Sequence, residues 1–176
     1  MKFNNHTDII IGHFINLREV ELEDANFILK LRCDEKKSLF LNSTDNNLQK
    51  QIDYLKRYKT LPDEWYFISE DKQKKQIGTI RIYNINNTTF TYGSWLMEDG
   101  VFPWQSIETE QLCKQFAFDE LGMELLRFDV RKGNKKVLRY HQLCGSKIVA
   151  ENDLDYFFEL TKEDYLKNKN KILQLM

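Results

Sequence analysis

The chain has 176 residues, a length that suits one domain, and its net charge of −1 gives no general attraction to nucleic acid or to an anionic membrane. Hydrophobic residues make up 41% and charged residues 30%, as in an ordinary globular protein. Only 7 glycines and 2 prolines are present, and neither GxGxxG nor GxxxxGKS/T occurs. The sequence therefore argues against Rossmann and P-loop nucleotide enzymes.

The cysteines and the N-terminal residues bear on cellular location. Cys33, Cys113 and Cys144 are odd in number and form no CxxC pair, so neither a disulfide framework nor a metal site is expected. This usage fits a reducing, cytoplasmic compartment. Polar residues interrupt Met1–Ile15, and no apolar run of 18 residues occurs, so neither a signal peptide nor a membrane partner is expected.

Strand and helix patterns alternate in the first half of the chain. Period-two alternation predicts a strand over Ile15–Val20, and Asp24 opens an amphipathic helix. Thr44 or Asp45 is expected to cap a second helix. The apolar residues of this second helix recur at helical spacing and are Leu48, Ile52 and Leu55. Three strands are then predicted, the last two joined by a turn at 84–88, over Trp65–Ile68, Gln76–Tyr83 and Thr89–Met97.

The second half of the chain predicts three helices and three strands. A helix is expected over Ile107–Leu121, and the strand Leu125–Arg131 alternates apolar with charged residues. Asn134 can cap the following helix, which ends at Gly145, and Thr161 can open a final helix. Two closing strands are predicted over Lys147–Ala150 and Tyr156–Leu160. This order predicts an α/β fold with a mixed sheet.

The order of elements and several residues resemble the GNAT superfamily, the acyl-CoA-dependent N-acetyltransferases. The strongest part of the resemblance runs from Phe116 to Gly122 and on through Asn134, His141 and Gly145. The opening, which contains Leu17-Arg18-Glu19-Val20 and Glu23-Asp24-Ala25, is also typical. The chain looks most like the ribosomal-protein alanine acetyltransferases and the enzymes that act on nucleotide-linked amino sugars.

The resemblance implies a single acyl-CoA N-acyltransferase domain over residues 1–176. Its core covers about residues 14–160, and residues 161–176 form a C-terminal helix. A GNAT-like sheet is mixed and mostly antiparallel, is flanked by helices, and splays to form a wedge for coenzyme A. Acetyl-CoA is then the cosubstrate, and no metal is required.

Coenzyme A is expected in the gap between the strand that ends at Met97 and the strand Leu125–Arg131. By resemblance it pairs with the backbone of Trp95, Leu96 and Met97, where amides can also polarise the thioester carbonyl. The pyrophosphate would lie at the N-terminus of the Ile107 helix, because unpaired N–H groups and the helix dipole favour anions there.

The loop before this helix departs from the family's glycine-rich pattern. It reads Val101-Phe102-Pro103-Trp104-Gln105-Ser106, in which only Ser106 keeps a small residue at a position where the family has one. The resemblance still implies phosphate binding near Trp104, Gln105, Ser106 and Ile107. The alternative is a helix start packed by Phe102 and Trp104. Asn134 is either a coenzyme contact or a helix cap, and the two roles are compatible.

His141 is the leading candidate for the acid that protonates the departing thiolate. It stands where the family commonly has a tyrosine, and an imidazole with a pKa near ~6.5 could donate to a thiolate whose thiol has a pKa near ~8.5. Tyr140 is the alternative acid, and a buried core histidine is the alternative role for His141. Glu108, expected in the first turn of its helix, either accepts the amine's proton or complements the helix dipole. Tyr92 and Asp99 are weaker candidates for the base.

The leading hypothesis is acetyl transfer within a direct ternary complex of acetyl-CoA and an amine. A nucleotide-linked amino sugar is slightly favoured over a protein N-terminus as the acceptor, and a monomer or a homodimer is expected. Aromatic residues of the central strands either stack an acceptor or form core pairs. These aromatic residues are Trp65, Tyr66, Phe67, Tyr83, Tyr92 and Trp95. The alternatives are a non-catalytic GNAT-like module that binds acyl-CoA or a protein, and a structural subunit.

Overall fold

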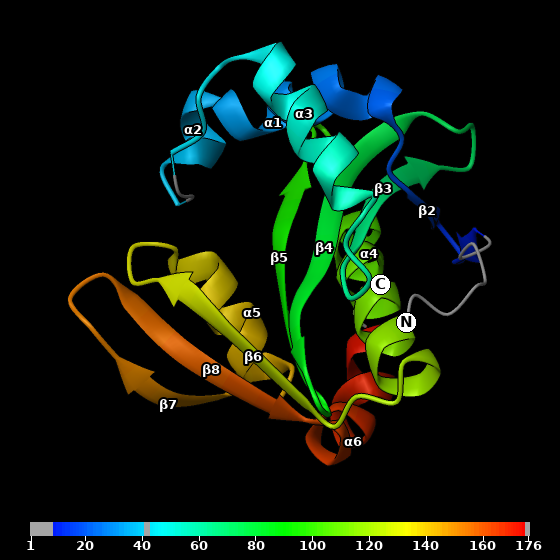
Figure 1. Cartoon of the computed structure of the whole chain (residues 1–176). Helices are drawn as coiled ribbons and strands as arrows, with labels where there is room; N and C mark the ends of the chain where they lie inside the picture. The colour runs from blue at the N-terminus through cyan, green and yellow to red at the C-terminus, as the bar shows by residue number, and fades with distance from the viewer. Residues whose placement is uncertain (1–8, 41–42, 175–176) are drawn as a thin grey trace.

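The computed structural model describes residues 9–40 and 43–174, whose strands form one eight-stranded sheet in the order β1-β2-β3-β4-β5-β6-β8-β7 (Figure 1). The strands are β1 (Ile10–Ile11), β2 (Ile15–Glu19), β3 (Trp65–Asp71), β4 (Gln76–Asn86), β5 (Thr89–Met97), β6 (Leu125–Arg131), β7 (Lys147–Glu151) and β8 (Asp155–Thr161). The helices are α1 (Ala25–Cys33), α2 (Glu35–Ser38), α3 (Leu48–Tyr58), α4 (Pro103–Gln115), α5 (Lys135–Leu143) and α6 (Lys162–Leu173). Two short turns, the 3-10 turn η1 (Leu22–Asp24) and the π-helical turn η2 (Phe116–Glu120), precede α1 and follow α4.

The sheet opens between β5 and β6. Every other neighbouring pair of strands is antiparallel, whereas these two are parallel and share only the pairs Thr89↔Leu125 and Phe90↔Leu126. Figure 1 shows the two strands diverging from this common point, with β4 on one side of the opening and β8 on the other. The predicted mixed, mostly antiparallel and splayed sheet is confirmed. Beyond Phe90, the described residues provide no strand partner for the edge of β5 that faces the opening.

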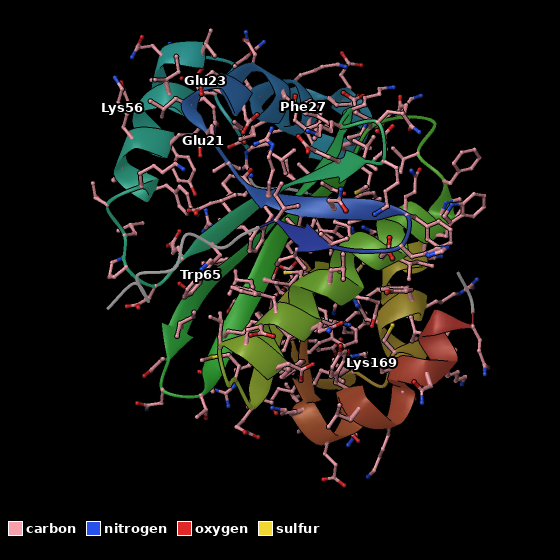
Figure 2. All side chains as sticks on the ribbon, turned by 90° about the vertical axis from the view of Figure 1, so that its right-hand side faces the viewer. Glu21, Glu23, Phe27, Lys56, Trp65 and Lys169 are labelled. Carbon is pink, nitrogen blue, oxygen red and sulfur yellow. The ribbon has the colours of Figure 1, made fainter. Side chains whose placement is uncertain are left out.

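Helices cover both faces of the sheet because its central strands are apolar on both sides. Phe67 points toward the larger core, which includes residues of α4, η2, β6 and β8, whereas Tyr66 points toward the core formed with α1 and α3. Ile80 and Ile82 share the α4 face, as the alternation of β4 predicts. Most of the candidate aromatic residues contribute to these two cores, so core packing is their main role. Figure 2 shows Phe27 and Lys56 at the α1–α3 end of the molecule and Lys169 at the opposite end.

Two helices begin at residues other than those expected. The cap of α3 is Asn47, whose side chain accepts a hydrogen bond from the backbone N–H of Lys50 at 3.0 Å, and not Thr44 or Asp45. The helix expected from Ile107 begins at Pro103, because a proline has no N–H to lose at the first helical position and its φ already suits a helix. The regular α4 ends at Gln115, and η2 completes the helical segment.

The ends of the last two helices follow the sequence signals. Asn134 caps α5 by accepting from the N–H of Val137 at 3.4 Å, and Thr161 caps α6 by accepting from the N–H of Asp164 at 3.1 Å. Gly145 follows α5 with a φ of 91°, a conformation that glycine adopts without steric cost. No sequence signal predicted β1 or α2, which are only two and four residues long. Of the helices that the structure describes, none is long and apolar enough to cross a membrane.

Candidate active site

A bulge in β5 lies where the sheet opens. Thr79 pairs with Leu96 and Arg81 pairs with Gly93, so β5 carries one more residue than β4 between these pairs. Ser94, within the bulge, has a φ of 51°, which is unusual for a residue with a side chain, and its carbonyl accepts a hydrogen bond from Thr79 Oγ1 at 2.7 Å. A bulge re-aims the residues that follow it, and it commonly lies beside an active site.

Trp95 is the second residue of the bulge, and its ring contacts α5. Its ring centroid lies 5.6 Å from that of Tyr140 and 6.0 Å from that of His141. The indole Nε1 is buried and has no hydrogen-bond partner. A buried donor without an acceptor is costly, and an amide carbonyl, such as those in the pantetheine arm of coenzyme A, would satisfy it. Trp95 together with the unpaired edge of β5 at Leu96 and Met97 therefore fits a coenzyme A arm.

A buried polar cluster is centred on α4 and includes one side chain each from β5 and α5. Glu110 and Lys114 are 0% and 1% exposed and form an ion pair of 2.5 Å. Tyr140 Oη donates to Glu110 Oε2 at 3.0 Å, and Tyr92 Oη donates to Glu110 Oε1 at 3.2 Å. Gln111 Nε2 donates to Glu110 Oε2 at 2.9 Å. Sequence reasoning missed Glu110 and Lys114, although their spacing of four residues on a helix that also carries Cys113 was an available signal.

His141 lies in the core and not in the opening. Its side chain is 2% exposed, its ring centroid is 4.6 Å from that of Phe128, and its Nε2 is 3.1 Å from Tyr92 Oη. Burial, assisted by the positive charge of Lys114, lowers the pKa of His141 well below its usual value. The lowered pKa favours the neutral ring, which makes an imidazolium less available as a proton donor than an ordinary pKa would.

Tyr140, one residue earlier on α5, is half-buried and contacts Trp95 beside the opening. Its hydroxyl donates to Glu110 and accepts from Gln111 Nε2 at 3.2 Å. Burial and the negative charge of Glu110 raise the pKa of Tyr140 well above its usual value. The phenol therefore keeps its proton at neutral pH, and in this structure that proton is donated to Glu110.

Glu108 has a different position and different partners from those expected. It lies beyond the first turn of α4, because the helix begins at Pro103. Its carboxylate accepts from the backbone N–H groups of His13 at 2.6 Å, Phe14 at 2.6 Å and Ile15 at 2.8 Å. A carboxylate that binds three backbone N–H groups holds the β1–β2 turn against α4. Neither a helix-dipole role nor access to an amine is consistent with this geometry.

The N-terminus of α4 offers few donors to a pyrophosphate. Pro103 has no N–H, and the N–H groups of Gln105 and Ser106 both donate to Phe102 O, at 3.0 Å and 3.3 Å. The N–H of Trp104 is thus the first-turn donor without a helical acceptor. Ile107, expected to begin the helix, lies inside it. Its backbone N–H therefore makes a hydrogen bond within the helix and is not a free donor for a phosphate.

The contacts around the start of α4 fit the alternative given above, a helix start packed by Phe102 and Trp104. Phe102 and Trp104 stack with centroids 4.5 Å apart and an interplanar angle of 7°. Gln105 Oε1 accepts from the N–H of Phe102 at 3.2 Å. Asn134, at the start of α5, uses its carbonyl oxygen as the helix cap, which leaves its amide nitrogen for a ligand. Within residues 9–40 and 43–174, no group of three or more His, Cys, Asp or Glu residues could hold a metal ion.

A pocket of about 300 Å³ lies on the other face of β5, between the bulge and the helices α1 and α3. Its lining residues are Arg32, Ser43, Thr44, Asp45, Lys50, Gln51, Tyr54, Tyr66, Arg81 and Ser94. Ser94 thus borders the pocket, and the next residue, Trp95, borders the opening between β5 and β6. Two ligands that enter from these two sides would meet at the bulge. Sequence reasoning had named Tyr66 among the aromatic residues that either stack an acceptor or form core pairs, but it had identified none of the other lining residues as binding residues.

The chain belongs to the GNAT acetyltransferase family. The model of the acetyltransferase (GNAT) domain matches residues 15–147, which include the bulge, the polar cluster and the pocket. Members of this family are acetyltransferases that use acetyl-CoA as cosubstrate. No curated protein sequence matches the chain.

Solved structures agree with this assignment. The apo structure of FdhC, described as a nucleotide-linked sugar GNAT, superposes with a TM-score of 0.84 at 29% identity, over 93% of this chain and 95% of that chain. A dodecameric spermidine N-acetyltransferase from Vibrio cholerae shares the fold, with a TM-score of 0.75 and 16% identity over 88% of this chain and 98% of that chain. A putative acetyltransferase from T. thermophilus gives a TM-score of 0.76 at 16% identity, over 96% of each chain.

Proposed function

We propose that this protein transfers the acetyl group of acetyl-CoA directly to a primary amine of a nucleotide-linked amino sugar. The observation that carries the proposal is the bulge at Ser94 and Trp95, which borders the opening between β5 and β6 on one face and the pocket on the other. The two substrates can then react without a covalent enzyme intermediate. The similarity to FdhC, a nucleotide-linked sugar GNAT, supports this class of acceptor.

The donor side of the proposed site is built mainly from backbone. Acetyl-CoA supplies the activated thioester, and the backbone of Trp95, Leu96 and Met97 along the free edge of β5 binds its pantetheine arm. A backbone N–H near Leu96 polarises the thioester carbonyl as negative charge develops on its oxygen. Trp95 Nε1 donates to the arm, and the N–H of Trp104 with the amide of Asn134 contributes to the binding of the distal part of the coenzyme.

Tyr140 is the acid of the proposed reaction. Attack of the neutral amine on the thioester carbon forms the C–N bond and breaks the C–S bond, and the departing thiolate takes the proton of the Tyr140 hydroxyl. The nitrogen then loses a proton to water, and water returns a proton to the Tyr140 phenolate. Tyr140 contacts Trp95 in the opening, and its hydroxyl is held by Glu110 and Gln111. His141 is a neutral core residue that positions Tyr92. Glu108 is given no catalytic role, because its carboxylate is occupied by the β1–β2 turn.

Thiol release in the presence of acetyl-CoA and a nucleotide-linked amino sugar tests this assignment. Tyr140→Phe is expected to lower kcat by about 10²-fold or more, the usual contribution of a general acid, while the Kd for coenzyme A stays unchanged. His141→Leu, the matched substitution of the adjacent residue, is expected to keep most of the activity. Loss of activity in His141→Leu with full activity in Tyr140→Phe would reverse the assignment. Coenzyme A binding without turnover of any amine would favour a non-catalytic module.

A further inference from the structure

The pocket beside Ser94 carries an excess of positive charge. Arg32, Lys50 and Arg81 line it, whereas Asp45 is its one acidic lining residue within the described parts of the chain. Asp45 and Lys50 form an exposed ion pair of 2.5 Å with each other. Because Asp45 and Lys50 neutralise each other, the positive charge available to a ligand comes from Arg32 and Arg81.

Arg32 reaches the pocket from α1 without a counter-ion. Its Nε donates to Thr44 Oγ1 at 2.9 Å, and its Nη1 lies 3.4 Å from Ser94 Oγ. Among the residues that the structure describes, no carboxylate forms an ion pair with it. A guanidinium presents five N–H donors in a planar fork, so two neutral hydroxyls leave much of its capacity unused. A half-buried arginine of this kind attracts an anionic group, and its fork matches phosphate oxygens.

Arg81 enters the same pocket from β4 and is held in a fixed position. It donates to Tyr54 Oη, and its guanidinium carbon lies 4.1 Å from the centroid of the Tyr83 ring. Its Nε is buried and has no hydrogen-bond partner, and the nearest ion pair, to Glu64, is long at 3.8 Å. The second guanidinium is thus pre-positioned but only weakly neutralised.

Gln51 adds a neutral donor to the pocket. It comes from α3, its side chain is 7% exposed, and its amide Nε2 has no hydrogen-bond partner. Leaving such a donor unpaired costs about 1–3 kcal/mol, so a ligand that brings an acceptor oxygen gains the corresponding hydrogen bond. The buried side-chain atoms of this pocket that have no hydrogen-bond partner are Gln51 Nε2, Arg81 Nε and Tyr66 Oη, and each of them can donate.

We propose that this pocket is an anion-binding site in which Arg32, Arg81 and Gln51 hold a phosphate or diphosphate group of the acceptor substrate. Such a group places the rest of the acceptor beside Ser94, where the amine meets the thioester. A polyamine acceptor is disfavoured, because its positive charges would face two guanidinium groups. The inference rests on the proposed function for its link to catalysis, but the anion site is testable without any reaction.

Binding of inorganic pyrophosphate and of uridine diphosphate, measured by isothermal titration calorimetry, tests the site directly. Both probes are expected to bind, and more weakly as ionic strength rises. Arg32→Gln and Arg81→Gln are each expected to weaken binding by about tenfold or more, because each removes charge-assisted hydrogen bonds. Lys56→Gln is the matched control, because Lys56 also carries positive charge but points outward from α3 (Figure 2). Spermidine is expected not to bind.

A further variant keeps the test decisive if the arginine variants fail to fold. Gln51→Leu removes a buried donor that has no partner, so it is expected to leave the fold intact and still weaken diphosphate binding several-fold. Equal binding of pyrophosphate and uridine diphosphate would mean that the phosphates alone are recognised, and tighter binding of the nucleotide would add contacts to its nucleoside. Either result supports an anion site.

Two results would overturn the inference. In the first, the protein binds coenzyme A but does not bind the diphosphate. In the second, coenzyme A displaces the bound diphosphate, which would make the pocket part of the coenzyme's own site. Failure of the proposed function looks different, because diphosphate then binds and Arg32→Gln weakens it, but no amine releases the thiol. The two proposals can therefore fail independently.

Discussion

Adjacent side chains on α5 differ in burial, although both contact Trp95 and Glu110. One residue along a helix turns the side chain by about 100°, which is enough to send Tyr140 toward the opening and His141 into the core. The sequence analysis placed His141 first and Tyr140 second as the acid, because it relied on spacing relative to Asn134 and Gly145, which does not reveal the rotation of the helix. Burial then determines the chemistry, since it keeps His141 neutral and Tyr140 protonated.

His141 is expected to make stability depend on pH. Because folding lowers its pKa, the unfolded chain binds a proton below about pH 6.5 that the folded protein excludes. The free energy of unfolding should therefore fall as the pH drops below about 6.5, with a slope of up to ~1.4 kcal/mol per pH unit from this group, and should not depend on it at higher pH. Urea denaturation at several pH values between about 5 and 7.5 measures this slope.

His141→Leu should remove this part of the slope. The control is Leu143→Gln, which changes an exposed residue without a titratable group on the same helix and should keep the wild-type pH dependence. If His141→Leu had the same slope as the wild type, the neutral, buried state of His141 would be contradicted.

At the scale of elements, α4 contacts two separate places in the sheet, the β1–β2 turn and the opening between β5 and β6. Glu108 binds the β1–β2 turn on one side of the helix, and Glu110 with Lys114 supports the opening between β5 and β6. Both acidic residues lie on a helix whose start the sequence misplaced by one turn. Its start at Pro103 places Glu108 beyond the first turn, where its carboxylate reaches the β1–β2 turn.

Glu108→Gln should destabilise the protein by about 2 kcal/mol, because an amide replaces a carboxylate oxygen that accepts from backbone N–H groups. Denaturant unfolding measures the effect, and Glu120→Gln, at an exposed position of η2, is the control. The folded fraction of Glu108→Gln should retain activity. A variant that is as stable as the wild type but inactive would restore Glu108 as a base.

At the scale of the whole molecule, the sheet consists of two parts, β1 to β5 and β6 to β8. Only two residue pairs, between β5 and β6, join these parts. A ligand in the opening would bind the free edge of β5 and link the two parts. Ligand binding stabilises the folded state in proportion to the logarithm of its concentration, by about 2.7 kcal/mol at 100 times its Kd.

Coenzyme A should therefore slow hydrogen exchange most strongly around Trp95–Met97 and in β6. These segments flank the opening, whereas β3 and β4 lie within continuous antiparallel pairing and should change little beyond the global stabilisation. Mass spectrometry of peptides with and without coenzyme A measures this difference. Protection confined to the α1–α3 pocket would contradict the proposed position of the coenzyme.

Local patterns allowed most of the fold to be predicted. Alternation set the faces of β4 and β6, and Asn134, Gly145 and Thr161 marked helix ends, because these signals depend on residues close in the sequence. The splayed sheet followed from the resemblance of the ordered elements to the GNAT superfamily. Short elements such as β1 and α2 escaped prediction, since two and four residues are too few to show a periodic pattern.

The sequence by itself determined the family, the order of elements and the two neighbouring acid candidates, because these are written in periodicity and spacing along the chain. Tertiary structure alone decided which of the two faces the opening. It also brought Arg32 of α1, Gln51 of α3 and Arg81 of β4 into one pocket. No local pattern relates these three residues, because their proximity arises only when helices pack on the sheet and a bulge at Ser94 reshapes its surface.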